Sequence, residues 1–289
     1  TRSDRDWSSD VCSSDLEYAF WNRYVYVNPD RDFVELERRR LAEMSQKSSP
    51  LKIEYQDMRA YVREGSERFD MLVANGGDPD TLAANRLYTV EFFRQAASRL
   101  TDSGVLLLFA LEPGNYIPEA EGEFLATVAG DLRSAFKYTT LLPFSRYAFA
   151  ASNAPQIKQY AGTIDVELQM IAPIPRYFTH EFVKDRLSNS CMEMLTRALQ
   201  KATAGGIAIN SDASPIALLQ KSLLDASRFG NDSVKLSVWT RNGRIWVYAI
   251  LAFLFVIPVA LSRFRPIKAF SPLAAVALGW GARLRHFNL

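Results

Sequence analysis

The sequence predicts an α/β protein built on a doubly wound, mainly parallel sheet. Short β-branched and apolar runs alternate with amphipathic stretches of helical period, which is the pattern of strands connected by crossover helices. The run GVLLLFAL, Gly104 to Leu111, is continuously apolar, as expected for a strand that is buried on both faces. From Ala154 onward the strand pattern stops and only helical patterns remain, so a helical segment is expected to follow the sheet.

The first predicted strand, Tyr24–Val27, is a β-branched and aromatic run that ends at Asn28-Pro29. A helix is predicted over Asp32–Met44, where apolar residues recur at helical spacing among charged ones. The alternating stretch Leu51–Tyr55 predicts a second strand, which leads to Asp57 and a short helix over Met58–Glu64.

The third predicted strand, Phe69–Ala74, ends at Asn75 and breaks at a glycine pair followed by Asp78-Pro79. A helix is predicted over Thr89–Leu100, before the apolar strand that begins at Gly104. The β-rich segments Phe136–Leu142 and Tyr147–Ala151 are expected to close the sheet as an antiparallel pair.

The helical extension, residues 154–240, contains three predicted helices: Arg176–Leu187, Met192–Ala204 and Ser214–Ser227. The residues that follow, 241–289, have the character of a membrane tail. Ile245–Ser262 contains no charged residue and would be about 27 Å long as a helix, close to the hydrocarbon thickness of a bilayer. Basic residues flank both ends, so a transmembrane helix of unassigned orientation is predicted, with a buried core helix as the alternative. A second apolar run, Phe270–Trp280, fits either another span or an interfacial helix.

The first sixteen residues are expected to be foreign to the protein. The stretch DWSSDVCSSDL, Asp6 to Leu16, back-translates codon for codon to a common sequencing adapter. We therefore expect residues 1–16 to be a cloning or assembly remnant, residues 17–153 to form a partial α/β domain, and the natural chain to begin further upstream.

Composition excludes several classes of protein. The net charge of +2 is near balance and no basic-aromatic patch is visible, so nucleic-acid binding is not expected. Outside residues 1–16 the only cysteine is Cys191, and the two histidines, His180 and His286, have no ligand spacing around them. Neither an internal disulfide nor a metal site is expected.

Two segments support a family resemblance. DPDTLAANRLYTVEFF, Asp78 to Phe93, and INSDASPIALL, Ile209 to Leu219, resemble motifs of membrane-associated bacterial relatives of spermidine synthase. These relatives fuse an aminopropyltransferase-like domain to transmembrane helices. The resemblance implies a methyltransferase-like, Rossmann-like fold that binds S-adenosylmethionine or its decarboxylated form, and a location in the bacterial inner membrane with the α/β domain in the cytoplasm. It also implies membrane lipid and a polyamine or other small amine as partners; the oligomeric state is not indicated.

The resemblance assigns roles to five positions in this sequence. Tyr26 and Asn28 take the places of the acidic residues that hold the ribose, and Asp57 matches the acidic residue that faces the adenine. Asp78 matches the second of two acids that hold the amine, and Asn75 replaces the first, which is the catalytic aspartate. The glycine-rich loop and the central first strand have no counterpart, so Tyr24–Val27 and Leu51–Tyr55 are expected to lie apart from Phe69–Ala74 and Gly104–Leu111.

The replacement at Asn75 bears directly on chemistry. Aminopropyl transfer needs a neutral amine, and a carboxylate that accepts its proton contributes roughly 10²–10⁴-fold to the rate. An amide has neither basicity nor charge, so Asn75 can orient a substrate without deprotonating it. Polyamine synthesis is therefore expected to be altered or lost.

Structural roles remain open for the other candidates. Asp57 precedes a short helix and also suits an N-cap, and Asp78-Pro79 also suits a turn. Arg86 is expected to bind an anionic ligand group or to pair with Glu91 or Asp78. The aromatic stripe Tyr88, Phe92 and Phe93 is expected in the core.

Three functions follow from these observations. The first is an aminopropyltransferase-like domain of a membrane protein that is catalytically altered or silent. The second is an active enzyme on S-adenosylmethionine, either a methyltransferase or a polyamine enzyme with shifted catalytic residues. The third is the ligand-sensing domain of a transporter-like protein.

Overall fold

The computed structural model describes residues 23–36, 38, 51–157 and 179–228 of the chain, which we call the described part. All of these residues lie in the compact unit formed by residues 1–230. Residues 1–16, the predicted span at 245–262 and the apolar run at 270–280 lie outside the described part. Within the described part, none of the helices has both the length and the apolar character that a membrane crossing requires.

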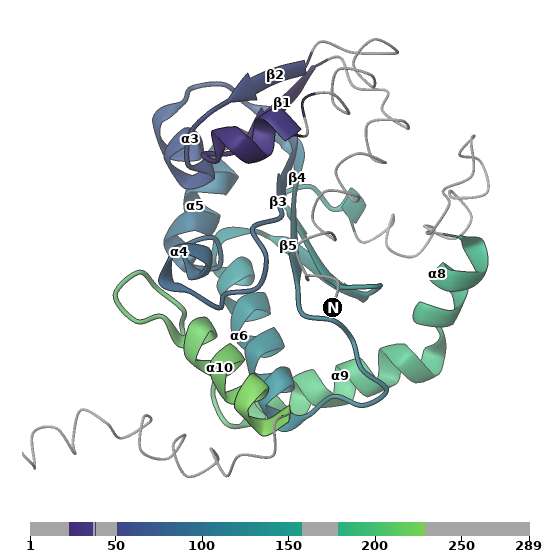
Figure 1. Cartoon of the computed structure of the whole chain (residues 1–289). Coiled ribbons are helices and arrows are strands. Elements are labelled where there is room, and N and C mark those ends of the chain that lie inside the picture. Colours follow the sequence, from purple (N-terminus) through teal and green to yellow (C-terminus); the bar gives the residue numbers. More distant parts are fainter. Residues whose placement is uncertain (1–22, 37, 39–50, 158–178, 229–289) are drawn as a thin grey trace, which may run out of the picture. The chain divides into compact units, whose positions relative to one another are not determined.

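The strands form two sheets (Figure 1). In the smaller sheet, β1 (Tyr24–Val27) pairs in parallel with β2 (Leu51–Glu54). The larger sheet has the strand order β3 (Phe69–Ala74), β4 (Leu100–Ala110), β6 (Tyr147–Ser152), β5 (Tyr138–Pro143). In it β3 and β4 are parallel, whereas β6 runs antiparallel to both β4 and β5.

The two sheets agree with two predictions from the sequence. The separation of β1 and β2 from β3 and β4 is confirmed, since the two pairs belong to different sheets. The closing antiparallel pair is also confirmed, and it makes the larger sheet mixed rather than mainly parallel. The physical reason is that the chain reverses after β5 in a tight turn and inserts β6 beside β4, where a parallel strand would need a longer crossover.

The helices are, in chain order, α3 (Met58–Glu64), α4 (Leu82–Asn85), α5 (Val90–Arg99), α6 (Glu119–Ala135), α8 (His180–Arg186), α9 (Asn189–Ala204) and α10 (Ile216–Arg228). Residues 31–36 are also helical, within the helix predicted over Asp32–Met44. The predicted helices at Met58–Glu64, Thr89–Leu100, Met192–Ala204 and Ser214–Ser227 are confirmed to within three residues at either end. Thr89 is the N-cap of α5, where its hydroxyl accepts a hydrogen bond from the backbone N–H of Phe92.

Successive side chains of β4 point to opposite faces of the sheet and pack in two separate hydrophobic clusters. Leu106, Leu108 and Ala110 belong to the main core, which also contains the side chains of α5 and α6. Phe109 points to the other face and packs with a smaller cluster that includes Val183 of α8. The aromatic stripe is confirmed as core, because Tyr88, Phe92 and Phe93 are fully buried.

Helix α6 is the long element that the sequence patterns above do not assign. Its apolar residues Phe124, Leu125, Val128 and Leu132 recur at helical spacing and are all buried. The glycines at positions 122 and 130 obscure this period, but they have a packing reason: a Cβ on Gly122 would lie 3.3 Å from the Ala198 carbonyl oxygen of α9. The close approach of α9 to α6 therefore depends on a residue that lowers helix propensity.

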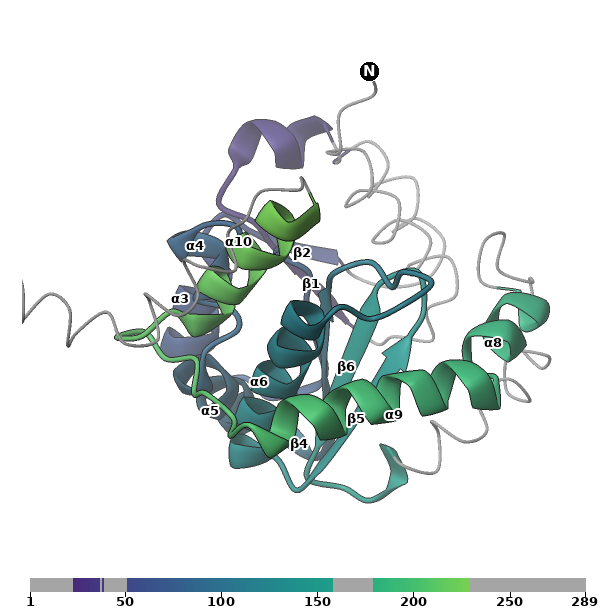
Figure 2. The ribbon, with the colours of Figure 1, turned by 90° about the horizontal axis from the view of Figure 1, so that it is seen from below.

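Helices α9 and α10, which follow the sheet in the sequence, pack against α6 (Figure 2). Leu195 of α9 and Ala217 and Leu224 of α10 are buried in the main core. The helical extension therefore completes the core of the α/β domain.

Candidate functional site

The loop between β3 and α4, residues 75–81, follows a parallel strand at its carboxyl end, the position where open α/β sheets place ligand-binding residues. Gly77 adopts φ +78°, which a side chain would make costly. The Tyr88 hydroxyl lies 2.6 Å from the Gly77 carbonyl oxygen and 2.7 Å from that of Phe109, so its proton is shared between the two acceptors. Burial raises the pKa of Tyr88, which therefore stays a donor. This residue of the first motif fixes the loop to β4.

Asp78 has two close partners, both on its Oδ1 oxygen. Its Oδ1 accepts a hydrogen bond from the backbone N–H of Leu111 at 2.8 Å, and the same oxygen pairs with the guanidinium of Arg146 in the β5–β6 turn. Leu111 has φ +50°, a left-handed conformation that is strained for leucine. Asp78 thus stabilises the unusual end of β4, and its charge is already balanced by a cation of the chain.

Asn75 is half-buried at the start of the same loop. Its side chain forms no hydrogen bond with another residue of the described part, in contrast to the fixed carboxylate of Asp78. The structure therefore brings Asn75 and Asp78 to one loop. An amide and a carboxylate that is paired with an arginine lie where the family resemblance implies two acids.

The candidate cofactor residues lie at the ends of the small sheet. The Asn28 side-chain amide donates to the Tyr26 hydroxyl at 3.2 Å, and Asn28 Oδ1 accepts from the Asp30 N–H. Asp57 is the N-cap of α3, where it accepts from the backbone N–H of Ala60 at 3.0 Å. The N-cap role is therefore confirmed, but the Asp57 side chain is 48% exposed and remains accessible to a ligand.

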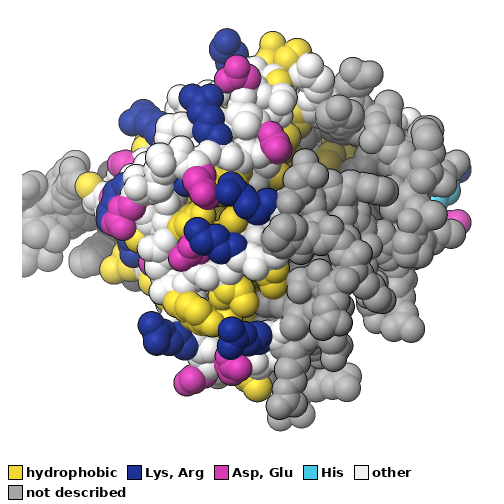
Figure 3. Space-filling view, turned by 90° about the horizontal axis from the view of Figure 1, so that it is seen from above, with side chains coloured by type: hydrophobic (Ala, Val, Ile, Leu, Met, Phe, Trp, Pro, Cys, Tyr) yellow, Lys and Arg dark blue, Asp and Glu magenta, His cyan; other side chains and the backbone are white. Residues whose placement is uncertain are grey.

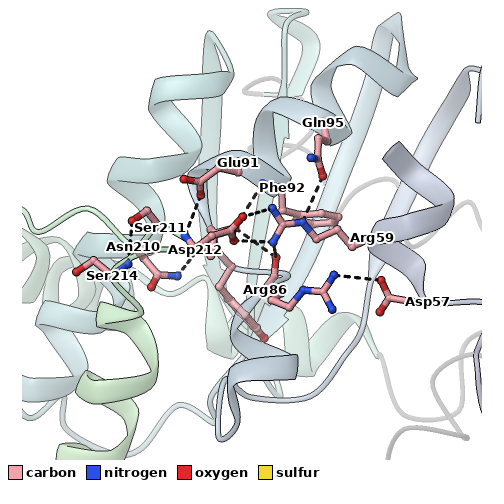
Figure 4. Close-up of polar contacts among 12 residues, drawn as sticks. Asp57, Arg59, Arg86, Glu91, Phe92, Gln95, Asn210, Ser211, Asp212 and Ser214 are labelled. Atoms are coloured by element: carbon pink, nitrogen blue, oxygen red, sulfur yellow. Dashed lines mark hydrogen bonds and ion pairs between the residues drawn. The ribbon is translucent and has the colours of Figure 1, made fainter. Parts of the chain in front are cut away.

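Arg86 pairs with Asp57, at 3.6 Å, rather than with Glu91 or Asp78 as expected from the sequence. The reason is geometric: Arg86 is the C-cap of α4, and its backbone carbonyl accepts a hydrogen bond from Arg59 of α3. Figure 4 shows the Arg86 side chain directed toward Asp57 beside this contact. The pair links the loop region after β3 to the start of α3.

Arg59 forms a bidentate ion pair with Asp212, which comes from the second motif (Figure 4). The two N–O distances are 2.6 and 2.5 Å, and the Arg59 side chain is only 7% exposed. Thr89 donates a further hydrogen bond to Asp212, and Glu91 accepts one from the Asp212 backbone N–H. Hydrogen bonding from Arg59 lowers the pKa of Asp212, so the carboxylate stays charged.

Asn210 of the second motif has a structural role. It is fully buried, its Nδ2 donates to the Tyr88 carbonyl, and its Oδ1 accepts from the Ala217 N–H at the start of α10. In return, Asn85 of the first motif accepts from the Leu218 N–H. The two motifs therefore interlock and attach the helical extension to the α/β domain.

Two buried carboxyl groups on α6 lie beneath this attachment. Asp131 accepts from the Asn210 N–H at 2.9 Å, and burial raises its pKa to about 7. Glu121 accepts from the Tyr147 hydroxyl at 2.7 Å, and burial raises its pKa as well. Both groups face inward, so their role is in packing rather than in ligand contact.

Three basic residues were missed by sequence reasoning: Arg59, Arg146 and Lys221. Isolated basic residues on amphipathic helices and turns look like solvated surface, and no motif marks them. Only the fold shows that they pair with Asp212 and Asp78, which the motifs had marked. On the face of the described part shown in Figure 3, basic and acidic side chains are interspersed among hydrophobic ones.

The chain is similar in sequence to a known protein family and to two curated proteins. The model of the spermine/spermidine synthase domain matches residues 16–144. The polyamine aminopropyltransferase of Pyrobaculum calidifontis is 32% identical over 142 residues, which cover 46% of this chain and 48% of that protein. The corresponding protein of Pyrobaculum islandicum is 28% identical over 142 residues.

The chain contains a spermidine synthase-like domain.

The spermidine synthase-like domain also has the fold of a solved relative. A spermidine synthase crystallised with the transition-state analogue AdoDATO has a TM-score of 0.50 and 16% identity, covering 67% of each chain. At this identity the likeness supports the mixed α/β, methyltransferase-like fold alone. The chain spans about half the length of the curated relatives that it matches.

Proposed function

We propose that this spermidine synthase-like domain binds an S-adenosylmethionine-type nucleoside but does not carry out aminopropyl transfer at the level of its enzymatic relatives. The observation that carries the proposal is the charge state of the β3–α4 loop. Asn75 supplies no base, and the Asp78 carboxylate is paired with Arg146 and accepts a hydrogen bond from the backbone N–H of Leu111.

The nucleoside part of the proposal rests on the residues at the ends of β1 and β2. Asp57 accepts one backbone hydrogen bond and is about half exposed, which leaves a carboxylate oxygen able to accept from an adenine amino group. Tyr26 and Asn28 hydrogen-bond to each other and offer a hydroxyl and an amide to a ribose in place of a carboxylate. The donor set therefore suits a nucleoside held less tightly than by an acidic pair.

The chemistry part follows from what the loop can do to an amine. Such a nucleoside, when bound, supplies an electrophilic carbon beside a sulfonium. Attack by an amine requires that a proton leaves nitrogen, and an amide at position 75 cannot take it. The Arg146 guanidinium also reduces the negative potential that would attract a polycation.

We further propose that the domain belongs to an integral protein of the bacterial inner membrane, with residues 245–262 as a span and membrane lipid as a partner. The uncharged sequence and its basic flanks support this, together with the resemblance of the two motifs to membrane-associated relatives. In that arrangement the α/β domain lies in the cytoplasm, where nucleoside and polyamine are available.

Calorimetry on the full-length gene product tests the proposal. We expect 5′-methylthioadenosine and S-adenosylmethionine to bind, and Asp57→Ala to weaken binding at least about tenfold, equivalent to 1.4 kcal/mol. Asp102→Ala is a matched control, because Asp102 is a fully exposed carboxylate near the amino end of β4. Equal affinities for the wild type and Asp57→Ala would overturn the assignment of the nucleoside site. Formation of S-adenosylhomocysteine with an amine acceptor would instead identify a methyltransferase.

A further inference from the structure

The ammonium group of Lys221 lies among three carboxylates. Its Nζ is 2.6 Å from Asp225 Oδ2, 3.0 Å from Asp80 Oδ1 and 3.9 Å from Asp78 Oδ2. Asp225 is one turn further along α10, whereas Asp78 and Asp80 belong to the β3–α4 loop. The helical extension therefore inserts a cation into the loop that ends β3.

This ammonium is unusual in its burial. The Lys221 side chain is 9% exposed, whereas the side chains of Asp80 and Asp225 are 59% and 37% exposed. Lysine is rarely buried to this degree without paired charges, because desolvation of an ammonium is costly. Burial opposes the charge, but the hydrogen bonds to Asp225 and Asp80 raise the pKa of Lys221, so the group remains protonated.

The carboxylates would attract a free amine if Lys221 were absent. Two carboxylates within hydrogen-bonding distance of one nitrogen, with a third at 3.9 Å, suit a primary ammonium, which has three N–H donors and no acceptor. They lie at the carboxyl end of a parallel strand, where this fold binds its ligands. The partly exposed Asp80 and Asp225 leave the cluster accessible from solvent.

We propose that Lys221 is a specificity-determining residue: its side chain occupies an ammonium-binding position and keeps free alkylamines, polyamines included, away from the carboxylates of the β3–α4 loop. The inference rests on the proposed function in one respect, that this loop faces a ligand. Together with Arg146 on Asp78, Lys221 offsets most of the negative charge that this cluster would present to a cationic substrate.

Substitution of Lys221 tests this directly. Lys221→Met removes the ammonium and keeps most of the apolar stem, so the packing of α10 is largely preserved. We expect putrescine and n-propylammonium, measured by calorimetry without nucleoside, to bind Lys221→Met at least about tenfold more tightly than wild type. Tetramethylammonium, which has no N–H donor, should show no such gain.

Lys201→Met is the matched control. Lys201 also pairs with a carboxylate, Glu119 at 3.6 Å, but its side chain is 72% exposed and no second carboxylate of the described part pairs with it. If Lys221→Met does not fold, Lys221→Gln gives the same comparison, with thermal stability in n-propylammonium chloride against sodium chloride as the readout. A gain restricted to the Lys221 variants supports the proposal.

Equal amine affinity in wild type, Lys221→Met and Lys201→Met would overturn it and leave Lys221 as a structural ion pair. Binding of 5′-methylthioadenosine in the same samples separates the two proposals. Amine binding that appears without nucleoside binding would retain the role of Lys221 and refute the proposed function alone.

Discussion

Removal of the Asp212 carboxylate should destabilise the fold through Arg59. Asp212→Ala deletes a bidentate contact at 2.6 and 2.5 Å and leaves a guanidinium that is 7% exposed. Arg59 keeps weaker contacts with the Gln95 side chain and the Arg86 carbonyl, both at 3.3 Å. Because the Asp212 side chain is partly exposed, water can reach the vacated position. We therefore expect a loss of about 2–3 kcal/mol in the free energy of unfolding, which is less than the cost of breaking a fully buried pair.

A double-mutant cycle separates the ion pair from other effects. Arg59→Met should cost less than Asp212→Ala, since it leaves no buried cation, and the coupling energy between the two sites should be about 1–2 kcal/mol. The exposed pair Arg197–Glu193 on α9 is the matched control, for which we expect about 0.3–0.5 kcal/mol.

Urea unfolding followed by circular dichroism at 222 nm measures these differences. If Asp212→Ala costs no more than Glu193→Ala, or if the coupling is zero, then the second motif does not stabilise the domain through Arg59. The attachment of the helical extension would then need another explanation.

Three further predictions concern buried polar groups. Tyr88→Phe leaves two carbonyl oxygens without their donor and should cost about 1–2 kcal/mol in urea unfolding. The pKa of Asp131 is raised to about 7 from 3.8 by burial, so the folded state binds more protons and stability should fall as pH rises from about 4 to 7; Asp131→Asn should remove that slope. The guanidinium of Arg99 is buried beside the rings of Tyr61 and Phe69 and has no hydrogen-bond partner among the described residues. Arg99→Met should therefore leave the melting temperature unchanged or raise it. A clear fall in the melting temperature would show that the cation–π contacts outweigh the cost of desolvation.

Much of the fold could be predicted because local patterns and tertiary structure agree in most elements. The apolar run that forms β4 and the amphipathic period of α5 are strong local signals. Helix α5 is found within one residue of its predicted bounds, and β4 contains the predicted strand except Leu111 but begins four residues earlier, at Leu100. Helix α6 was missed because Gly122 and Gly130 serve close packing against α9 and Ile207, which a single sequence does not reveal.

The candidate site could be predicted only in part. Sequence alone places Asn75 and Asp78 in one loop, and the family resemblance points to the segment Ile209–Leu219, which contains Asn210 and Asp212. It cannot show that Asp78 pairs with Arg146, because this contact depends on β6 running antiparallel beside β4. It likewise cannot show that Lys221 reaches the same loop, because that contact depends on how α10 docks.

The most direct test of the account is an aminopropyl-transfer assay. The full-length gene product and its Asn75→Asp and Asn75→Asp/Arg146→Gln variants would be incubated with decarboxylated S-adenosylmethionine and putrescine, with the Pyrobaculum calidifontis enzyme as positive control and spermidine measured by mass spectrometry. We predict no spermidine from the wild type, at most a trace from Asn75→Asp, and more from the double variant, in which Asp78 is released from its guanidinium partner. Turnover of the wild type at the level of the positive control would contradict the central claim that this loop has lost the base for polyamine synthesis.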